Sequence, residues 1–172
     1  MVAGMITPDF VRLMARYNAW QNRSLYAAAS GLPDAARRTD RGAFFGSIHG
    51  TLSHLLWGDS VWLSRFGVGE APAGSIAASP GFEPDWDRLA ARRAETDARI
   101  SDWSERVAAD WLGGEIAWHS AVMGREVTRS TALCVVHFFN HQAHHRGQVH
   151  AMLTAAGARP EDTDLIVLPD EV

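Results

Sequence analysis

Histidines are concentrated near the end of the sequence, where residues 137–150 read HFFNHQAHHRGQVH and contain five imidazoles. On an α-helix, residues four positions apart lie about 40° apart around the axis, so their side chains are neighbours on one face. Four imidazoles and one amide share such a face: His137, His141, His144, His145 and Gln148. Two overlapping HxxxH pairs, 137/141 and 141/145, could each present two nitrogen ligands to one metal ion. The spacing alone leaves both pairs open.

A third ligand is expected from another element, because catalytic metal sites commonly use three protein ligands. His54 lies in the segment GTLSHLLWGD, among leucines, where an imidazole without a partner would be costly. His49 is about 140° away around the same helix, so we expect the two not to reach one ion. The sequence therefore favours His54. The opposing interpretation of His54 is a core histidine that is hydrogen-bonded to a backbone carbonyl. In that case the histidines would stabilise the bundle and hold no metal.

Three neutral imidazoles leave a divalent cation with open coordination positions, as in catalytic rather than closed structural sites. Such a site could lower the pKa of a bound water or deprotonate a substrate thiol. No glutamate follows the first histidine of either HxxxH pair, which argues against a zincin-type protease. The sequence also has no Glu-x-x-His pair of the ferritin-like di-iron centres. Imidazole ligands suit Zn, Ni and Fe alike, so the metal is not distinguished.

Other polar side chains are candidates to orient the ligands or a substrate. Metal-bound imidazoles usually donate their second N–H to a partner, and Gln148 and His144 lie on the ligand face for that role. Asn140 lies just beside this face, and His137 is a further candidate for the surroundings of the metal or for a pocket. Trp118 and His119, in a less regular segment, are candidates for a pocket mouth.

Two further residues carry structural expectations. Asp59 is about 140° around its helix from His54, so we expect it to cap a helix or to pair with Arg65 or Arg146 between helices. Gly147 in mid-helix costs about 0.5–1 kcal/mol relative to alanine, and a close approach of two helices is the simplest reason to accept that cost.

The elements that must position these residues are mostly helices. Apolar residues recur at helical spacing in four segments, approximately 8–30, 47–66, 83–107 and 130–156. The Gly-, Ala- and Pro-rich residues 67–81 predict a loop, residues 113–128 predict a small hairpin or structured loop, and the acidic tail is expected to pack back as an extended segment. Five tryptophans in the helical patterns are expected in the core: Trp20, Trp57, Trp62, Trp86 and Trp103. The pattern predicts a single all-α domain, a helical bundle, over residues 1–172.

Composition restricts the classes of partner. The chain has 172 residues, 16 basic and 20 acidic, for a formal net charge of −4. This balance argues against a large nucleic-acid footprint, which needs a basic face.

No apolar run reaches the roughly 18–20 residues that span a bilayer, and no secretory signal is visible at the start. With one cysteine, Cys134, the chain fits a reducing compartment, and we expect a cytoplasmic protein without membrane or nucleic-acid partners.

Three blocks of the sequence are similar to a known family. YNAWQNRSLY (17–26), HGTLSHLLWGDSVWLSRF (49–66) and HFFNHQAHHRGQVHAML (137–153) resemble the DinB/YfiT-like family, to which metalloenzyme activity is ascribed, in order and separation across nearly the whole chain. The resemblance implies an up-and-down four-helix bundle that holds a divalent metal with three histidines. Carried onto this sequence, the ligands are His54, His141 and His145, and His137 and His144 become pocket residues.

The resemblance also implies a function. It suggests a metal-dependent enzyme acting on a small molecule, of the thiol-dependent S-transferase type, with a low-molecular-weight thiol as co-substrate. Homodimer formation is expected because bundles of this family often pair. The alternatives are a metal-dependent hydrolase and a non-catalytic, stress-related bundle that binds a metal or ligand at the same site.

Overall fold

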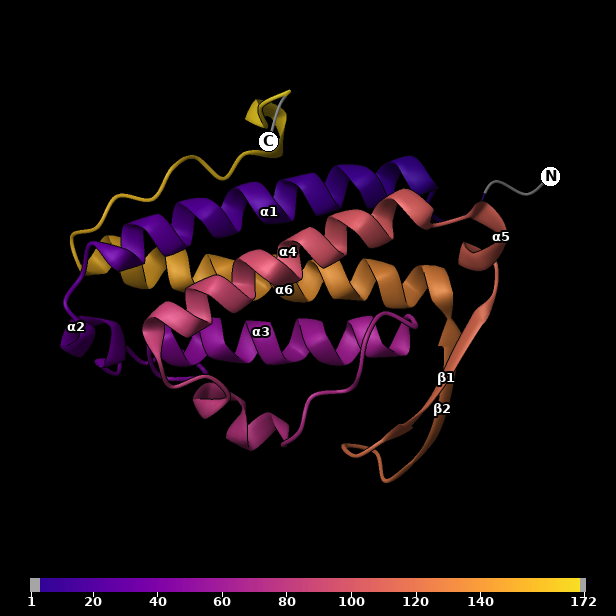
Figure 1. Ribbon diagram of the computed structural model, residues 1–172, viewed down its shortest axis with the longest axis horizontal. Coiled ribbons are helices and arrows are strands. Elements are labelled where there is room, and N and C mark those ends of the chain that lie inside the picture. The colour runs from indigo at the N-terminus through magenta and orange to yellow at the C-terminus, as the bar shows by residue number, and fades with distance from the viewer. Residues whose placement is uncertain (1–3, 171–172) are drawn as a thin grey trace.

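Four long helices packed side by side dominate the computed structural model, which describes residues 4–170 (Figure 1). The long helices are α1 (Pro8–Ser30), α3 (Ile48–Arg65), α4 (Trp86–Arg106) and α6 (Thr131–Ala155). Shorter elements connect them: α2 (Asp34–Arg38), a 3₁₀ turn (Ile76–Gly81), α5 (Ala109–Leu112), β1 (Glu115–Ser120), β2 (Arg125–Ser130) and a second 3₁₀ turn (Leu165–Val167). The predicted all-α four-helix bundle with a hairpin before the last long helix is confirmed.

Side chains fix where three of the long helices begin. The Thr7 hydroxyl accepts from the Phe10 N–H, the Ser47 hydroxyl from the Gly50 N–H, and the Asp85 carboxylate from the Arg88 N–H. Each N-cap satisfies a backbone donor that the helix leaves without a partner. The third long helix therefore begins after Asp85, slightly later than the sequence suggested.

The helices run in the order up, down, down, up within the bundle, which differs from the simple up-and-down order that the resemblance implied. Helices α3 and α4 point the same way, opposite to α1 and α6, because the long connection over residues 66–85 returns the chain to the end at which α3 begins (Figure 1). This connection was expected to be a loop, and it contains the 3₁₀ turn Ile76–Gly81, which packs against α3. Helices α3 and α6 are thus antiparallel neighbours.

A layer of buried polar side chains divides the core into two apolar clusters. The first cluster gathers around Phe66, Trp103 and Phe138, and the second around Leu52, Leu89 and Leu153. Between them, each long helix contributes to the polar layer, whose members are Asn18, Asn22, Asp59, Arg93, Asp97, Gln142 and Arg146.

Ion pairs and amide hydrogen bonds join this layer. Arg93 lies 2.7 Å from an Asp59 oxygen and 2.8 Å from an Asp97 oxygen, and Asn22 donates to Asp97. Arg146 donates to the side-chain oxygen of Asn18. The expectation that Asp59 pairs with Arg65 or Arg146 is wrong. Arg93 of α4 faces the buried carboxylate of Asp59 directly, a contact that the spacing within α3 could not reveal.

The C-terminal segment returns along α1, as Figure 1 shows. Side chains of α1 form hydrogen bonds with the backbone of this segment. The Tyr17 hydroxyl donates to the Thr163 carbonyl at 2.7 Å, and the Gln21 amide donates to the Asp162 carbonyl at 2.8 Å. The tail packs back as expected, but its apolar centre forms the second 3₁₀ turn instead of an extended strand. Ile166 there is 92% exposed, so the tail is held through its backbone and not through its apolar side chains.

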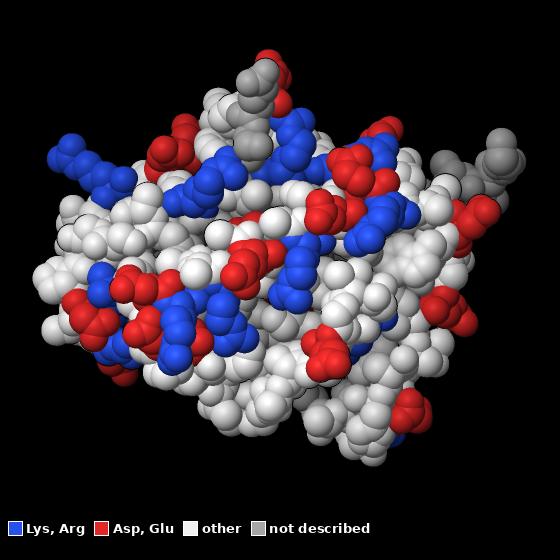
Figure 2. All heavy atoms as spheres, in the orientation of Figure 1, with Lys and Arg blue, Asp and Glu red and all other residues white. Residues whose placement is uncertain are grey.

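Charge on the face that carries α1 and α4 is mixed. Figure 2 shows basic and acidic side chains interspersed over this face, with no continuous basic surface. The picture agrees with the negative formal charge of the chain. Over residues 4–170, none of the helices is long and apolar enough to cross a membrane.

Candidate metal centre

Three imidazoles meet in the groove between α3 and α6. His54 comes from α3, and His141 and His145 come from successive turns of α6. One ligand nitrogen of each ring can be chosen so that all three lie within 4.8 Å of one another. The ring centroids are 5.2 Å apart for 54/141, 4.8 Å for 54/145 and 4.6 Å for 141/145. The structure thus brings together the set that the family resemblance implied.

The long connection fixes the tautomer of His54. The Ser79 hydroxyl donates to the Ile76 carbonyl at 2.6 Å, so it accepts from His54 Nδ1, 2.7 Å away. The proton of neutral His54 therefore sits on Nδ1, and the Nε2 lone pair points toward the other two rings. Position 79 was not identified as a site residue from the sequence, because it belongs to a predicted loop.

An amide fixes the tautomer of His145 in the same way. The oxygen of Gln148 accepts from His145 Nδ1 at 2.8 Å, and its nitrogen donates to His144 Nε2 at 3.3 Å. His145 is therefore left with a bare Nε2. A hydrogen bond to the far nitrogen of an imidazole is the usual way in which proteins orient a metal-binding histidine.

The arrangement of the three rings suits a cation. His54 Nε2 lies 3.1 Å from His141 Nε2. If His141 donates a proton across this gap, its own Nδ1 lone pair stays buried, and that atom has no hydrogen-bond partner within residues 4–170. A metal ion would instead accept a lone pair from each ring.

Electrostatics keep the rings neutral, as metal ligation requires. Burial, followed by the neighbouring imidazoles, lowers the pKa of His54 to about 3 and that of His141 to about 3. Burial also lowers the pKa of His145, although its hydrogen bond to Gln148 opposes this effect. All three rings therefore carry no proton charge near neutral pH.

Two residues shape the space around the rings. A Cβ atom on Gly58 would lie 3.0 Å from His141 Cε1, so glycine leaves the room that this ring occupies. Phe45 stacks on His54 with ring centroids 3.7 Å apart and covers one side of the cluster. The sequence offered a signal for Gly58, which follows His54 by four residues on the same helix face.

A cavity of about 280 Å³ opens beside the cluster. Its walls come from α3, the first 3₁₀ turn, β1, the hairpin turn and α6: His54, Trp57, Gly58, Val61, Trp62, Arg65, Ile76, Trp118, Ser120, Val122, His137 and His141. Trp62 packs against the first apolar cluster, as expected for a core residue, and also lines this cavity. Trp57 is half-buried and belongs to neither cluster, so the expectation that it lies in the core is wrong. Trp118 lines the cavity, as expected for a pocket residue, whereas His119 does not, and its Nδ1 lies 3.1 Å from a carboxylate oxygen of Glu126.

Both the sequence and the fold occur in known proteins. A family model described as the DinB family matches residues 5–171. The chain belongs to the DinB family. It is 26% identical over 161 residues to Protein DinB of Bacillus subtilis (strain 168), a match that covers 91% of each chain. A crystal structure of a DinB-like protein from Bacillus cereus has a TM-score of 0.61 at 16% identity and covers 83% of this chain and 90% of that one.

Other histidines of this DinB-family chain lie at different distances from the three-ring cluster. His144 is exposed beside it, with its ring centroid 4.8 Å from that of His145, but it does not line the cavity. His137 is exposed at the cavity wall, where its ring centroid lies 5.1 Å from that of Trp62 and 5.9 Å from that of His141. His49 is bonded through Nε2 to a backbone carbonyl, that of Glu83, at 2.8 Å. Asn140 is exposed and does not line the cavity.

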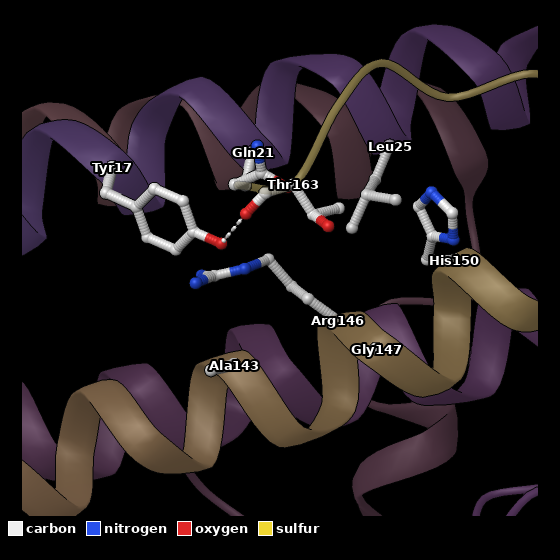
Figure 3. Close-up of a pocket in the computed structure, with 8 residues that line it drawn as sticks. All are labelled: Tyr17, Gln21, Leu25, Ala143, Arg146, Gly147, His150 and Thr163. Carbon is white, nitrogen blue, oxygen red and sulfur yellow. Dashed lines mark hydrogen bonds between the residues drawn. The ribbon is translucent and has the colours of Figure 1, made fainter. Parts of the chain in front are cut away.

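A second cavity, of about 230 Å³, lies between α1, α6 and the C-terminal segment (Figure 3). Figure 3 shows the Arg146 side chain extending toward Tyr17, whose hydroxyl is bonded to Thr163. Gly147 lines this cavity, and a Cβ atom there would meet nothing within 4 Å. The explanation of Gly147 by a close helix approach is therefore wrong, because the glycine borders open space.

Proposed function

We propose that this DinB-family chain is a metal-dependent enzyme whose mononuclear centre is held by His54, His141 and His145. The observation that carries the proposal is the convergence of three neutral imidazoles, two of which have their Nδ1 protons tied to acceptors and their Nε2 lone pairs free. A buried histidine without a metal needs only a hydrogen-bond partner, whereas His54, His141 and His145 direct ring-nitrogen lone pairs toward one another. His137 is assigned to the pocket wall.

The reaction proposed is transfer of a low-molecular-weight thiol to a small electrophilic molecule. A divalent metal at such a site supplies the charge that deprotonates a coordinating thiol. The protein's own groups support this choice over hydrolysis. Asp59 is the acidic residue whose charge affects the pKa of His145. It is paired with Arg93 at 2.7 Å and is therefore not available as a general base. The tryptophans of the cavity wall provide an apolar surface for the electrophile.

Elemental analysis of tag-free protein tests the centre. We expect about one divalent ion per chain, lost in each of His54→Ala, His141→Ala and His145→Ala. His137→Ala should keep the ion and is the matched control, because it removes a neighbouring imidazole of the same helix face. Loss of metal in His137→Ala but not in His145→Ala would mean that the other HxxxH pair holds the ion. No metal in the parent after anaerobic reconstitution would refute the proposal.

Thiol consumption tests the reaction class. The metal-loaded protein is mixed with an electrophile, 1-chloro-2,4-dinitrobenzene, and with glutathione, cysteine or coenzyme A in turn. Transfer forms a carbon–sulfur bond, releases chloride and gives the thiol proton to the buffer. A rate above background that disappears in His141→Ala supports the transferase. Metal-dependent ester cleavage without thiol consumption would favour a hydrolase, and stoichiometric metal with neither activity would favour the non-catalytic binding protein.

A further inference from the structure

Arg65 is a cation in the wall of the cavity beside the three histidines. It belongs to the last turn of α3, and its guanidinium carbon lies 4.5 Å from the ring centroid of Trp62 and 4.8 Å from that of Trp118 on the hairpin. Stacking against aromatic rings uses the faces of the planar guanidinium. Its N–H edge therefore stays available for an acceptor.

Arg65 differs from the other buried or half-buried arginines in having no anionic or carbonyl partner. Arg93 is paired with two carboxylates, Arg146 donates to Asn18, and Arg37 donates to backbone carbonyls. No ion pair or hydrogen bond of the Arg65 side chain occurs within residues 4–170, yet burial lowers its pKa. A desolvated charge of this kind is unfavourable unless something pairs with it.

Cys134 is the ionisable side chain whose negative form would stabilise the charge of Arg65, and it lies buried in the core at 3% exposure. Burial raises the pKa of the Cys134 thiol, so it is uncharged near neutral pH. Among residues 4–170, no counter-charge therefore meets the positive charge of Arg65, which faces the cavity.

We propose that Arg65 is the anion-binding residue of the substrate pocket and that the substrate is a small organic carboxylate with an apolar or aromatic body. A carboxylate matches the fork of a single guanidinium in both charge and geometry. The body of the molecule would lie against Trp57 and Trp62, which line the same cavity as His54 and His141. This inference deepens the proposed function and rests on it for the identity of the pocket.

The two ends of the cavity set the shape of such a molecule. Since α3 rises about 1.5 Å per residue, His54 and Arg65 are separated by roughly 16 Å along its axis. The Arg65 side chain leans back toward the N-terminal end of α3, as helical side chains do, and shortens this span. A carboxylate held at Arg65 thus leaves the opposite end of the substrate directed along the groove toward the histidine cluster.

Paired probes of equal shape test the inference. Phenylacetate and its neutral analogue phenylacetamide are titrated against the full chain, with tryptophan fluorescence as the readout, in metal-loaded and in chelator-treated protein. We expect phenylacetate to bind about tenfold or more tightly than phenylacetamide in both forms. Arg65→Gln should reduce this ratio to within about twofold while leaving the phenylacetamide affinity and the metal content unchanged. Arg129→Gln, outside the cavity wall, should keep the ratio of the parent.

The two forms of the protein separate this inference from the proposed function. A carboxylate preference that requires the metal and survives in Arg65→Gln would mean that the ion, not Arg65, binds the anion, and would overturn the inference. The absence of phenylacetate binding to both forms would overturn it as well. A preference that depends on Arg65 in a protein that binds no metal would support the pocket and refute only the metal-dependent function.

Discussion

Gly58→Ala is the smallest change that should disturb the candidate metal centre. The added Cβ atom would be fixed to the backbone of α3 and would lie 3.0 Å from Cε1 of the His141 side chain. Favourable carbon–carbon separations are about 3.5–4.0 Å. The His141 ring must therefore move by a few tenths of an ångström, or α3 and α6 must separate by as much.

The size of this displacement decides the expected effect on metal binding. Bonds from zinc to imidazole nitrogen are about 2.0–2.1 Å long, and a plausible site tolerates deviations of about 0.2 Å. A ring displaced by more than that tolerance should weaken the metal affinity, and we expect a loss of about 10–100-fold, the size seen when the support of a ligand is removed. The free energy of unfolding should fall by at most about 2.5 kcal/mol, because alanine gains about 0.5–1 kcal/mol in a helix interior and overpacking costs about 1–3 kcal/mol.

Gly147→Ala is the matched control for this experiment. It makes the same substitution in the interior of α6, two residues beyond His145, where the new methyl group meets nothing within 4 Å. We expect unchanged metal affinity and a gain of about 0.5–1 kcal/mol in the free energy of unfolding. Affinity is measured by competition with a chromophoric chelator, and stability by urea unfolding. If Gly58→Ala bound metal as tightly as Gly147→Ala, the argument from ring placement would be refuted.

Three further changes test other parts of the structure. Ser79→Ala removes the acceptor of His54 Nδ1, so chelator competition should show a metal affinity about 10–100-fold lower, and an unchanged affinity would contradict the assigned tautomer. Asp59→Asn leaves the buried charge of Arg93 partly uncompensated and should cost about 3–5 kcal/mol in urea unfolding, whereas a loss below about 1 kcal/mol would mean that the pair is not essential. Burial lowers the pKa of His49, so the unfolded chain takes up a proton there before the folded one does, and acid below about pH 6.5 destabilises the fold. The stability difference between the parent and His49→Gln should therefore shrink on acidification, by up to about 1.4 kcal/mol per pH unit between the two pKa values, and a constant difference from pH 7 to pH 5 would refute the assignment.

The long helices and the histidine cluster were accessible from the sequence because both depend on local periodicity. A spacing of four residues places His141 and His145 on one face of any α-helix, whatever packs against it. The apolar repeats likewise predicted the long helices to within a few residues. The choice of His54 over His49 required the angle between them on α3 and the position of His54 among leucines, and the structure places His49 against a backbone carbonyl.

Features that depend on which helices are neighbours were not accessible in this way. The partner of Asp59 is on α4, and nothing in the spacing within α3 points to Arg93. Ser79 lies in a segment whose composition predicts only a loop, although its hydroxyl orients His54. Trp57 and Trp62 follow the helical pattern of core residues, and only the position of the hairpin shows that they border a cavity.

The buried polar layer and the histidine cluster occupy the same level of the bundle. On α6, His145 and Arg146 are adjacent in sequence and therefore point about 100° apart, one into the groove toward α3 and the other into the core toward α1. An apolar core of Leu and Phe could repack after a small shift of one helix, whereas ion pairs of fixed geometry lose their partners. Two of these contacts, Asp59 with Arg93 and Arg146 with Asn18, join α3 to α4 and α6 to α1 at this level. The layer thus limits relative sliding of α3 and α6, the two helices whose separation sets the distances among the three imidazoles.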